Sequence, residues 1–528
     1  SRQNVFRCAG GGKMRVFLFG VDGLTFRILC PLIERGLLPN FQKLQELGVQ
    51  GILRSTVPPL TPPAWMSIAT GMSPARHGIY DFWHYEQTEH SLQAHVATHR
   101  LDGMTVWQAI SAWGLGSIIA NVPLTYPAEP FNGIMISGYM APGMHARVTY
   151  PASFKEELLQ AVPNYQIDLD PAVESEQIGN PLVATLQMTR EHIALLRFLM
   201  EKPWDFFFIV FTGADRIQHV RWQQVVAFHP QAVAYYQLLD EALGMVLDEL
   251  NPEDLLLVVS DHGFQGAQRQ FYIQEYLRKK GLLFVRHRNA LRHTQFQNRL
   301  AGLIRKPIWA IGLQGFPTLL RRQLYRYGMK AIATSPVAAK IPDLDWANTS
   351  AWVPSASGDV AGYADIFLDN TMTEGQINAL LADLRAIRDP VTGQALLAEA
   401  YREDVFGSGP FAPKERHLVL IANENTALRV ELGHSNLWDT CRPYGIHHPD
   451  GVLYLYGAGT KRGVTIAPTH VYDVVPTIFS AMGLPSYPGL EGRVIEEAFE
   501  RLPAPFSSPS HRGSVMSKLT RLASHSPD

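Results

Sequence analysis

This sequence has few cysteines, little net charge and no long hydrophobic run. Its 528 residues include three cysteines, Cys8, Cys30 and Cys441, and no two of them form a C-x-x-C pair. A disulfide framework and a thiolate zinc site are therefore disfavoured, and a reducing compartment is favoured. Any bound metal ion has to use oxygen and imidazole ligands.

Three further absences narrow the class of protein. The formal net charge is −2, which gives no indication of a nucleic-acid partner. No stretch reaches the roughly 18 apolar residues that a membrane-spanning helix needs. The segment 1–13 also lacks the apolar centre of a secretory signal peptide. We therefore expect a cytoplasmic globular protein that does not bind nucleic acid.

Buried-looking strands alternate with helical segments along most of the chain. Apolar runs at 16–21, 206–211 and 255–259 predict interior strands, and helical patterns occupy 181–200 and 231–250. This alternation is typical of a parallel sheet with helices on both faces. We therefore predict an α/β fold, a three-layer α/β/α arrangement with a mostly parallel central sheet and an inserted cap region.

The remaining elements of this domain follow from shorter signals. Pro62 and Pro63 suit the first turn of a helix, with Thr61 as its N-cap and Gly71 at its end. The other predicted elements are a helix over 31–47, a strand over 51–55, a helix over 105–113, a strand over 117–121, a strand over 452–456 and a helix over 471–482.

The alternation breaks between about residues 265 and 439, which we interpret as two insertions into one sheet domain. In the smaller insertion we predict a strand over 361–368, a helix over 373–387 and a strand over 417–422. The predicted boundaries are 14–264 and 433–500 for the catalytic domain, 265–342 for a basic helical cap, 343–432 for a small α/β insertion and 501–528 for a disordered tail.

Acidic residues and histidines stand where the predicted strands end. The candidates are Asp22 after strand 16–21, Asp215 and His219 after strand 206–211, Asp261 and His262 after strand 255–259, and His447 or its neighbour His448 in a loop before strand 452–456. Ligands of open parallel sheets bind outside the carboxyl ends of the strands. Each residue alone also fits a cap, turn or loop. Together they fit a site for two divalent ions, Zn²⁺ or, where oxygen donors dominate, Mn²⁺.

Thr61 is the candidate nucleophile. Its hydroxyl is weak in water, but a bound cation favours the alkoxide, and a helix start provides free amides for a phosphate oxygen. Two ions close together stabilise both the entering and the leaving oxygens of an in-line displacement. The pattern therefore predicts metal-assisted attack on the phosphorus of a small phosphorylated substrate.

Several motifs resemble the alkaline phosphatase superfamily, in particular its type I phosphodiesterase/nucleotide pyrophosphatase-like branch. They occur in the family's order along most of the chain. The matching segments are Phe19-Gly-Val-Asp-Gly23, Pro58 to Phe82, Asn121-Val-Pro-Leu-Thr-Tyr-Pro127, Asp215 to His219, Ser260-Asp-His-Gly263, His447-His-Pro-Asp-Gly451 and Tyr472-Asp-Val-Val-Pro-Thr477.

The resemblance implies a role for each candidate. One metal site comprises Asp22, Thr61, Asp261 and His262, and the other comprises Asp215, His219 and His447. It also implies a phosphothreonine intermediate on Thr61 that water then hydrolyses, with Asn121 on the substrate side. Asn121 fits a strand-end turn equally well. A phosphomutase reaction on the same fold and a catalytically inactive binding scaffold are the alternatives.

The stretch 277–342 is unusual because it contains no Asp or Glu but many Lys and Arg. Within it, the apolar run 307–320 has basic residues on both sides. We interpret the stretch as a helical lid whose apolar face packs on the core. The alternative is a basic, amphipathic surface that touches anionic lipid or guides a phosphorylated substrate towards the metals.

Overall fold

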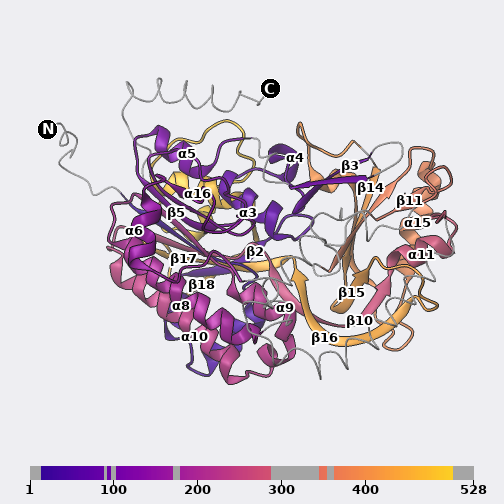
Figure 1. Ribbon diagram of the computed structural model, residues 1–528, viewed down its shortest axis with the longest axis horizontal. Helices are drawn as coiled ribbons and strands as arrows, with labels where there is room; N and C mark the ends of the chain where they lie inside the picture. The colour runs from indigo at the N-terminus through magenta and orange to yellow at the C-terminus, as the bar shows by residue number, and fades with distance from the viewer. Residues whose placement is uncertain are drawn as a thin grey trace.

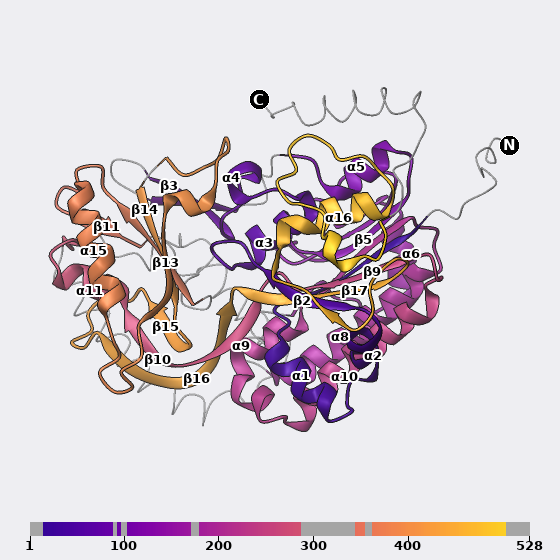
Figure 2. The same cartoon turned by 180° about the vertical axis from the view of Figure 1, so that it is seen from behind.

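The computed structural model describes residues 14–87, 92–96, 103–169, 179–286, 344–353, 362–414 and 416–502. Helices lie on both faces of a large central sheet, and smaller sheets form the other end of the molecule (Figures 1 and 2). The predicted α/β class, with a mostly parallel central sheet, is therefore confirmed.

The central sheet has ten strands in the part of the chain that is described. Their order is β18-β2-β17-β9-β1-β8-β5-β6-β7, and β19 also pairs with β2. The five strands β9, β1, β8, β5 and β6 run parallel, whereas β17 is antiparallel to both its neighbours and β7 to β6. The strands are β1 (Val16–Val21), β2 (Val49–Arg54), β5 (Ser117–Val122), β6 (Gly133–Ser137), β7 (Thr149–Tyr150), β8 (Phe206–Phe211), β9 (Leu255–Val259), β17 (Asp450–Gly457), β18 (Val464–Thr465) and β19 (Thr469–His470).

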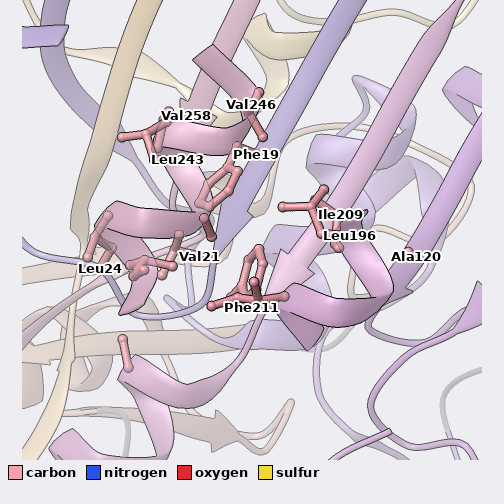
Figure 3. Close-up of a cluster of buried hydrophobic side chains, with 14 of the residues drawn as sticks. Phe19, Val21, Leu24, Ala120, Leu196, Ile209, Phe211, Leu243, Val246 and Val258 are labelled. Carbon is pink, nitrogen blue, oxygen red and sulfur yellow. The ribbon is translucent and has the colours of Figure 1, made fainter. Parts of the chain in front are cut away.

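Side chains of the central strands alternate between two hydrophobic cores. Phe17 and Phe19 of β1 belong to one core, while Leu18 between them belongs to the other. Figure 3 shows Phe19 and Phe211 of the first core among Leu196, Leu243 and Val246 from the covering helices. Burying one such phenylalanine contributes about 2 kcal/mol. These two cores hold the sheet in place, so the ends of its strands are fixed points.

The helices divide between the two faces. Helices α1, α2, α8 and α10 pack against the core that contains Phe19, and α3, α5 and α16 pack against the opposite one (Figure 2). The helices are α1 (Phe26–Glu34), α2 (Pro39–Leu47), α3 (Thr61–Thr70), α4 (Pro74–His77), α5 (Val106–Ala112), α6 (Phe154–Ala161), α8 (Pro181–Met200), α9 (Gly213–Val226), α10 (Pro230–Glu249), α11 (Ile273–Lys279), α15 (Glu374–Ala386) and α16 (Val474–Ala481).

Two local predictions about helices are wrong. The predicted helix 31–47 is two helices, because Gly36 with φ +69° turns the chain between α1 and α2. Thr61 is the first residue of α3 rather than its N-cap, which is Leu60. The Thr61 hydroxyl is therefore not used as a cap. The predicted end of this helix at Gly71, with φ +68°, is confirmed.

Two smaller sheets lie beyond the central sheet, and the long strand β10 belongs to one of them. One has the order β15-β10-β16 and the other β11-β12-β14-β13, and they share a third hydrophobic core with α11 and α15. The predicted strand, helix and strand of the small insertion correspond to β12, α15 and β14. The strands are β10 (Gly263–Tyr272), β11 (Ala351–Trp352), β12 (Tyr363–Leu368), β13 (Leu397–Arg402), β14 (Arg416–Ala422), β15 (Asn425–Arg429) and β16 (Trp438–His448), with a separate hairpin of β3 (Trp83–Gln87) and β4 (Leu92–Val96).

One prediction about this region is wrong and another lies outside the described residues. His447 was expected in a loop but lies in strand β16, which pairs antiparallel with β10. Residues 287–343, most of the predicted basic cap, are outside the described chain, as are 503–528 of the predicted tail. No helix of the described segments combines the length and apolar character needed to cross a membrane.

Candidate metal centre

The candidate ligands lie at the carboxyl ends of three adjacent parallel strands. Asp22 directly follows β1, Asp215 lies in the first turn of α9 after β8, and Asp261 and His262 follow β9. Since β1 pairs with both β8 and β9, these ends are neighbours at one edge of the sheet. Chain direction and strand order are therefore enough to bring these acids together.

Two other elements bring in residues that are distant in sequence. Thr61 comes from the first turn of α3, and His447 from β16, where it pairs with Phe264 of β10. The Phe264 ring contacts His219, His262 and His447, with centroid distances of 4.8, 5.8 and 5.2 Å. This aromatic side chain forms one wall of the site and fixes the three imidazoles against each other.

The first group of ligands surrounds the Nε2 atom of His262. Asp22 Oδ1 lies 3.5 Å from it, Asp261 Oδ2 lies 3.2 Å from it, and Thr61 Oγ1 lies 3.4 Å from it. All four residues are buried. We call Asp22, Thr61, Asp261 and His262 the inner cluster.

The second group surrounds Asp215 Oδ1. His219 Nε2 lies 3.2 Å from this oxygen and His447 Nε2 lies 3.3 Å from it, and the two nitrogens are 2.9 Å apart. We call Asp215, His219 and His447 the outer cluster. The rings of His262 and His447 stack with centroids 3.6 Å apart, so the two clusters share a boundary, and His262 lies within ligand distance of both.

The hydrogen bonds of the three imidazoles determine which ring nitrogen carries no proton. The Nδ1 atom of His219 lies 3.0 Å from the Gly445 carbonyl, and that of His262 lies 3.1 Å from the Gly263 carbonyl. The Nδ1 atom of His447 lies 2.9 Å from the Pro59 carbonyl. A carbonyl only accepts, so each Nδ1 carries the proton and each neutral ring has a lone pair on Nε2. Three lone pairs therefore point into one space, which is the arrangement that a cation requires.

The carboxylates support the same conclusion. Asp22 Oδ1, Asp215 Oδ1 and Asp261 Oδ2 are buried and have no hydrogen-bond partner among the described residues. The other oxygens are engaged, since Trp65 Nε1 donates to Asp22 Oδ2 and the Gly23 amide donates to Asp261 Oδ1. Burial of acceptors without donors is costly. The residues present therefore fit divalent cations.

The acids differ in their protonation behaviour. Burial, followed by the charge of Asp215, raises the pKa of Asp22 well above its usual value, and burial with the charge of Asp22 does the same for Asp261. Burial also acts to raise the pKa of Asp215, but His219, His447 and Arg216 together hold it well below its usual value. Burial lowers the pKa of both His262 and His447, which keeps these imidazoles neutral and able to bind a metal ion.

Comparison with known proteins agrees with this geometry. The family model for type I phosphodiesterase / nucleotide pyrophosphatase matches residues 16–310. This chain belongs to that family. The predicted membership in this branch of the alkaline phosphatase superfamily is confirmed, and its members' class, phosphoric ester hydrolases, agrees with the enzyme class expected from the sequence.

Individual relatives of this phosphodiesterase-family chain are distant. It is 25% identical over 281 residues to the venom phosphodiesterase CdcPDE of Crotalus durissus collilineatus, a match that covers 51% of this chain and 28% of the venom protein. Among solved structures, phosphonoacetate hydrolase from Sinorhizobium meliloti in complex with phosphonoformate has a TM-score of 0.55 and 15% identity, over 89% of this chain and 95% of that one. An inactive threonine-to-alanine variant of murine ectonucleotide pyrophosphatase/phosphodiesterase 5 in complex with AMP has a TM-score of 0.50 and 11% identity, over 92% and 100% of the two chains. These two structures show a common fold.

Asn121 is the one candidate that lies apart from the two clusters. It is at the end of β5, next to β8, and therefore at the same edge of the sheet. Its φ is +59°, it is buried, and its Nδ2 has no acceptor within the described part of the chain. No hydrogen bond between described residues joins it to the metal ligands. A buried, unused amide donor on the ligand edge suits a substrate contact better than a plain turn.

The sequence patterns missed several residues around the ligands. Arg216 donates from Nη1 to Asp215 Oδ2 over 3.1 Å and from Nη2 to Asp168 Oδ2 over 2.6 Å. Gln218 Nε2 donates to the Gly23 carbonyl over 2.8 Å and so links α9 to the turn after β1. Arg216 could have been identified from its position, because it is a charged residue next to the candidate ligand Asp215 at the buried start of a helix. No sequence signal pointed to Asp168, whose partner is 48 residues away.

Proposed function

We propose that this protein is a metal-dependent phosphohydrolase that cleaves phosphate mono- or diesters through a phosphothreonine intermediate on Thr61. One observation carries the proposal. Three unprotonated imidazole nitrogens and three unpartnered carboxylate oxygens form two adjoining clusters, and the Thr61 hydroxyl lies 3.4 Å from Nε2 of His262, where the clusters meet. That combination is what a hydroxyl nucleophile needs for attack on phosphorus at neutral pH.

The donor set suits two divalent ions. Mixed carboxylate and imidazole ligands favour Zn²⁺, with Mn²⁺ as the alternative. Bound ions would lower the pKa of the hydroxyl and stabilise charge on the entering and leaving oxygens. The proposed ligands are Asp22, Thr61, Asp261 and His262 for one ion and Asp215, His219 and His447 for the other.

The chain's own groups account for the chemistry of the substrate. Thr61 Oγ1 loses its proton and forms a bond to phosphorus, the bond from phosphorus to the ester oxygen breaks, and a proton goes to that oxygen as the alcohol leaves. A water molecule then attacks the phosphothreonine, the Oγ1–P bond breaks, a proton of the water restores the Thr61 hydroxyl, and phosphate or a phosphate monoester leaves.

Within the first turn of α3, the amide of Thr61 is the one available to a phosphoryl oxygen. Pro62 and Pro63 have no N–H, and the Ala64 amide already donates to the Leu60 carbonyl over 3.1 Å. The Thr61 N–H makes no hydrogen bond to the described residues, which leaves it available to a phosphoryl oxygen. The Nδ2 donor of Asn121 is the second candidate for such a contact.

The relatives support phosphorus chemistry at this site. The venom relative is a phosphodiesterase, the bacterial structure is a phosphonoacetate hydrolase with phosphonoformate bound, and the murine structure binds AMP and is inactive as a threonine-to-alanine variant. In the proposal, Thr61 has the corresponding role in this chain.

The test is hydrolysis of nitrophenyl phosphate monoesters and diesters after chelation and after addition of Zn²⁺ or Mn²⁺. We expect activity only with metal, and a loss of at least about 10³-fold for Thr61→Ala. Thr70→Ala is the matched control, because it removes another buried hydroxyl of α3, one that donates to the Met66 carbonyl and accepts from the Met72 amide at the far end of the helix. An active Thr61→Ala variant overturns the nucleophile assignment. Metal binding without hydrolysis favours the scaffold, and transfer to an added alcohol without phosphate release favours the phosphomutase.

A further inference from the structure

A short segment outside the strands and helices touches both sides of the candidate site. Residues 165–168 follow α6 and lie across the carboxyl ends of β5 and β8. Tyr165 bonds to Asn121, and Asp168 bonds to Arg216, which follows the ligand Asp215. No sequence motif marks any residue of this segment.

Tyr165 determines how the Asn121 amide can be used. Its hydroxyl is hydrogen-bonded to Asn121 Oδ1, and both side chains are buried. Burial raises the pKa of Tyr165, so the hydroxyl keeps its proton and acts as the donor. With its oxygen occupied, Asn121 has only its Nδ2 donor left, and this donor has no acceptor among the described residues. The hydroxyl therefore fixes the amide with the donor side free.

The backbone of Asn121 suggests that this orientation is imposed. Its φ of +59° lies in the left-handed region, which asparagine adopts more readily than most other non-glycine residues. Residues kept in such conformations cluster at ligand sites, where the surrounding structure holds them. Here the holding contacts include the Tyr165 hydroxyl and the close approach of Gly138 to the Asn121 carbonyl.

Asp168 acts on the metal side through Arg216. It accepts two hydrogen bonds from the guanidinium, 3.2 Å from Nε and 2.6 Å from Nη2. The remaining donor, Nη1, reaches Asp215 Oδ2 over 3.1 Å. A bidentate pair holds a guanidinium in one plane, and the ring of Tyr139 lies 4.2 Å from its central carbon. Asp215 is thereby held with Oδ1 facing His219 and His447.

The segment is itself anchored between these two contacts. The Gln166 carbonyl lies 2.9 Å from His192 Nε2 of α8, and the Tyr165 ring packs against the His192 ring with centroids 5.7 Å apart. The Thr212 hydroxyl approaches Asp168 Oδ1 at 3.5 Å just before α9 begins. Since α8 and α9 both pack on the core, the segment has a fixed support.

We propose that Tyr165 and Asp168 are positioning residues that align the two halves of the reaction site from one segment. Tyr165 holds the Asn121 amide so that Nδ2 can donate to a phosphoryl oxygen, and Asp168 holds Asp215 through Arg216 so that Oδ1 can bind metal. Neither residue touches the reacting atoms. The inference rests on the proposed function, because it assigns Asn121 to the substrate and Asp215 to a metal ion.

The first arm of the test is a double-mutant cycle on nitrophenyl ester hydrolysis. We expect Tyr165→Phe, which removes only the hydroxyl, to lower kcat/KM by about tenfold, and Asn121→Ala to lower it further. The double variant should be no worse than Asn121→Ala, because Tyr165 acts only through that amide. Tyr236→Phe is the control, since it removes a buried hydroxyl with no partner among the described residues, and it should leave kcat/KM unchanged.

The second arm measures metal affinity by competition with a chromophoric chelator. Asp168→Asn should weaken binding of one of two Zn²⁺ ions by roughly 10- to 100-fold, as loss of an outer-sphere partner does elsewhere. Tyr165→Phe should bind both ions as the wild type does. If Asp168→Asn does not fold, Arg216→Lys replaces it, because Lys cannot make the two-pronged contact.

The outcomes separate this inference from the function on which it rests. Two results would overturn the assignment of Tyr165 when the wild type hydrolyses esters and depends on Thr61. In the first, the losses of kcat/KM from Tyr165→Phe and Asn121→Ala multiply in the double variant. In the second, Tyr165→Phe has the same kcat/KM as the wild type. Unchanged zinc affinity in both metal-side variants overturns the assignment of Asp168. If the wild type hydrolyses no ester, the proposed function fails instead, and the chelator experiment still decides the role of Asp168.

Discussion

The inner and outer clusters meet at the stacked rings of His262 and His447 but are built differently. The inner cluster is closed, with Asp22 at 1% exposure and Asp261 at 0%, and no Lys or Arg of the described segments forms an ion pair with either carboxylate. In the outer cluster, the His219 side chain is 15% exposed, and Arg216 binds Asp215 directly. In the proposed function, a bound ion would neutralise the inner acids, whereas the chain itself already partly neutralises Asp215.

The largest expected effect comes from Asp22→Asn, which breaks the inner cluster. Ester hydrolysis should fall by at least about 10³-fold, because a direct ligand is lost. The metal-free protein should nevertheless become more stable, because the amide removes one of two repelling charges and can donate to His262 Nε2, now 3.5 Å from Asp22 Oδ1. Thermal unfolding in chelator measures this gain.

Asp240→Asn is the matched control for that stability gain. Asp240 is also buried, but it accepts hydrogen bonds from the Asn40 and Phe41 amides at the start of α2. The same substitution should therefore destabilise the protein by about 1 kcal/mol. A destabilised Asp22→Asn variant in the metal-free state would contradict the view that the inner acids need an ion.

A smaller effect is expected from His219→Ala in the outer cluster. Its ring is partly exposed, so a water molecule can take the vacated position on the ion. Zinc affinity should fall by about 10- to 100-fold at one site only, with a comparable loss of activity that excess Zn²⁺ restores. Equilibrium dialysis against graded Zn²⁺ measures the affinity, and ester hydrolysis at the same Zn²⁺ concentrations measures the activity. Loss of both ions would mean that the clusters are not separable in this way.

The smallest effect concerns pH and the metal-free inner cluster. Because the pKa of Asp22 is raised in the folded state, its charge costs stability at neutral pH, and the cost fades as pH falls through that raised value towards the ordinary value of 3.8. The stability advantage of Asp22→Asn over wild type in chelator should therefore shrink with acidification. Urea unfolding of the two proteins at several pH values tests this. An advantage that grows in acid would show the opposite sign of the pKa shift.

Much of the fold could be predicted because its signals are local. The runs at 16–21, 206–211 and 255–259 are apolar on both faces, which only a strand covered on both sides can satisfy, and each is a strand with the predicted ends or within one residue of them. Because parallel strands end at one edge, the position of Asp22, Asp215 and Asp261 in one group followed from the order of elements.

Other features could not be predicted because their causes are distant in sequence. His447 lies in a segment that has the composition of a loop, yet pairing with β10 makes it part of a strand. Thr61 was expected to cap α3, but Leu60 is the cap, and the hydroxyl lies beside His262, 201 residues away. Pairing and packing partners of this kind leave no periodicity in the chain itself.

The sequence by itself determined the sheet, the edge at which the acids gather and the residue types available to a cation. Only the tertiary structure decided which nitrogen of each imidazole is bare, since that depends on the carbonyls of Pro59, Gly263 and Gly445. It also decided that Tyr165 and Asp168 serve the site. Hydrogen bonds between distant segments are a matter of three-dimensional proximity, and no local pattern of residues encodes them.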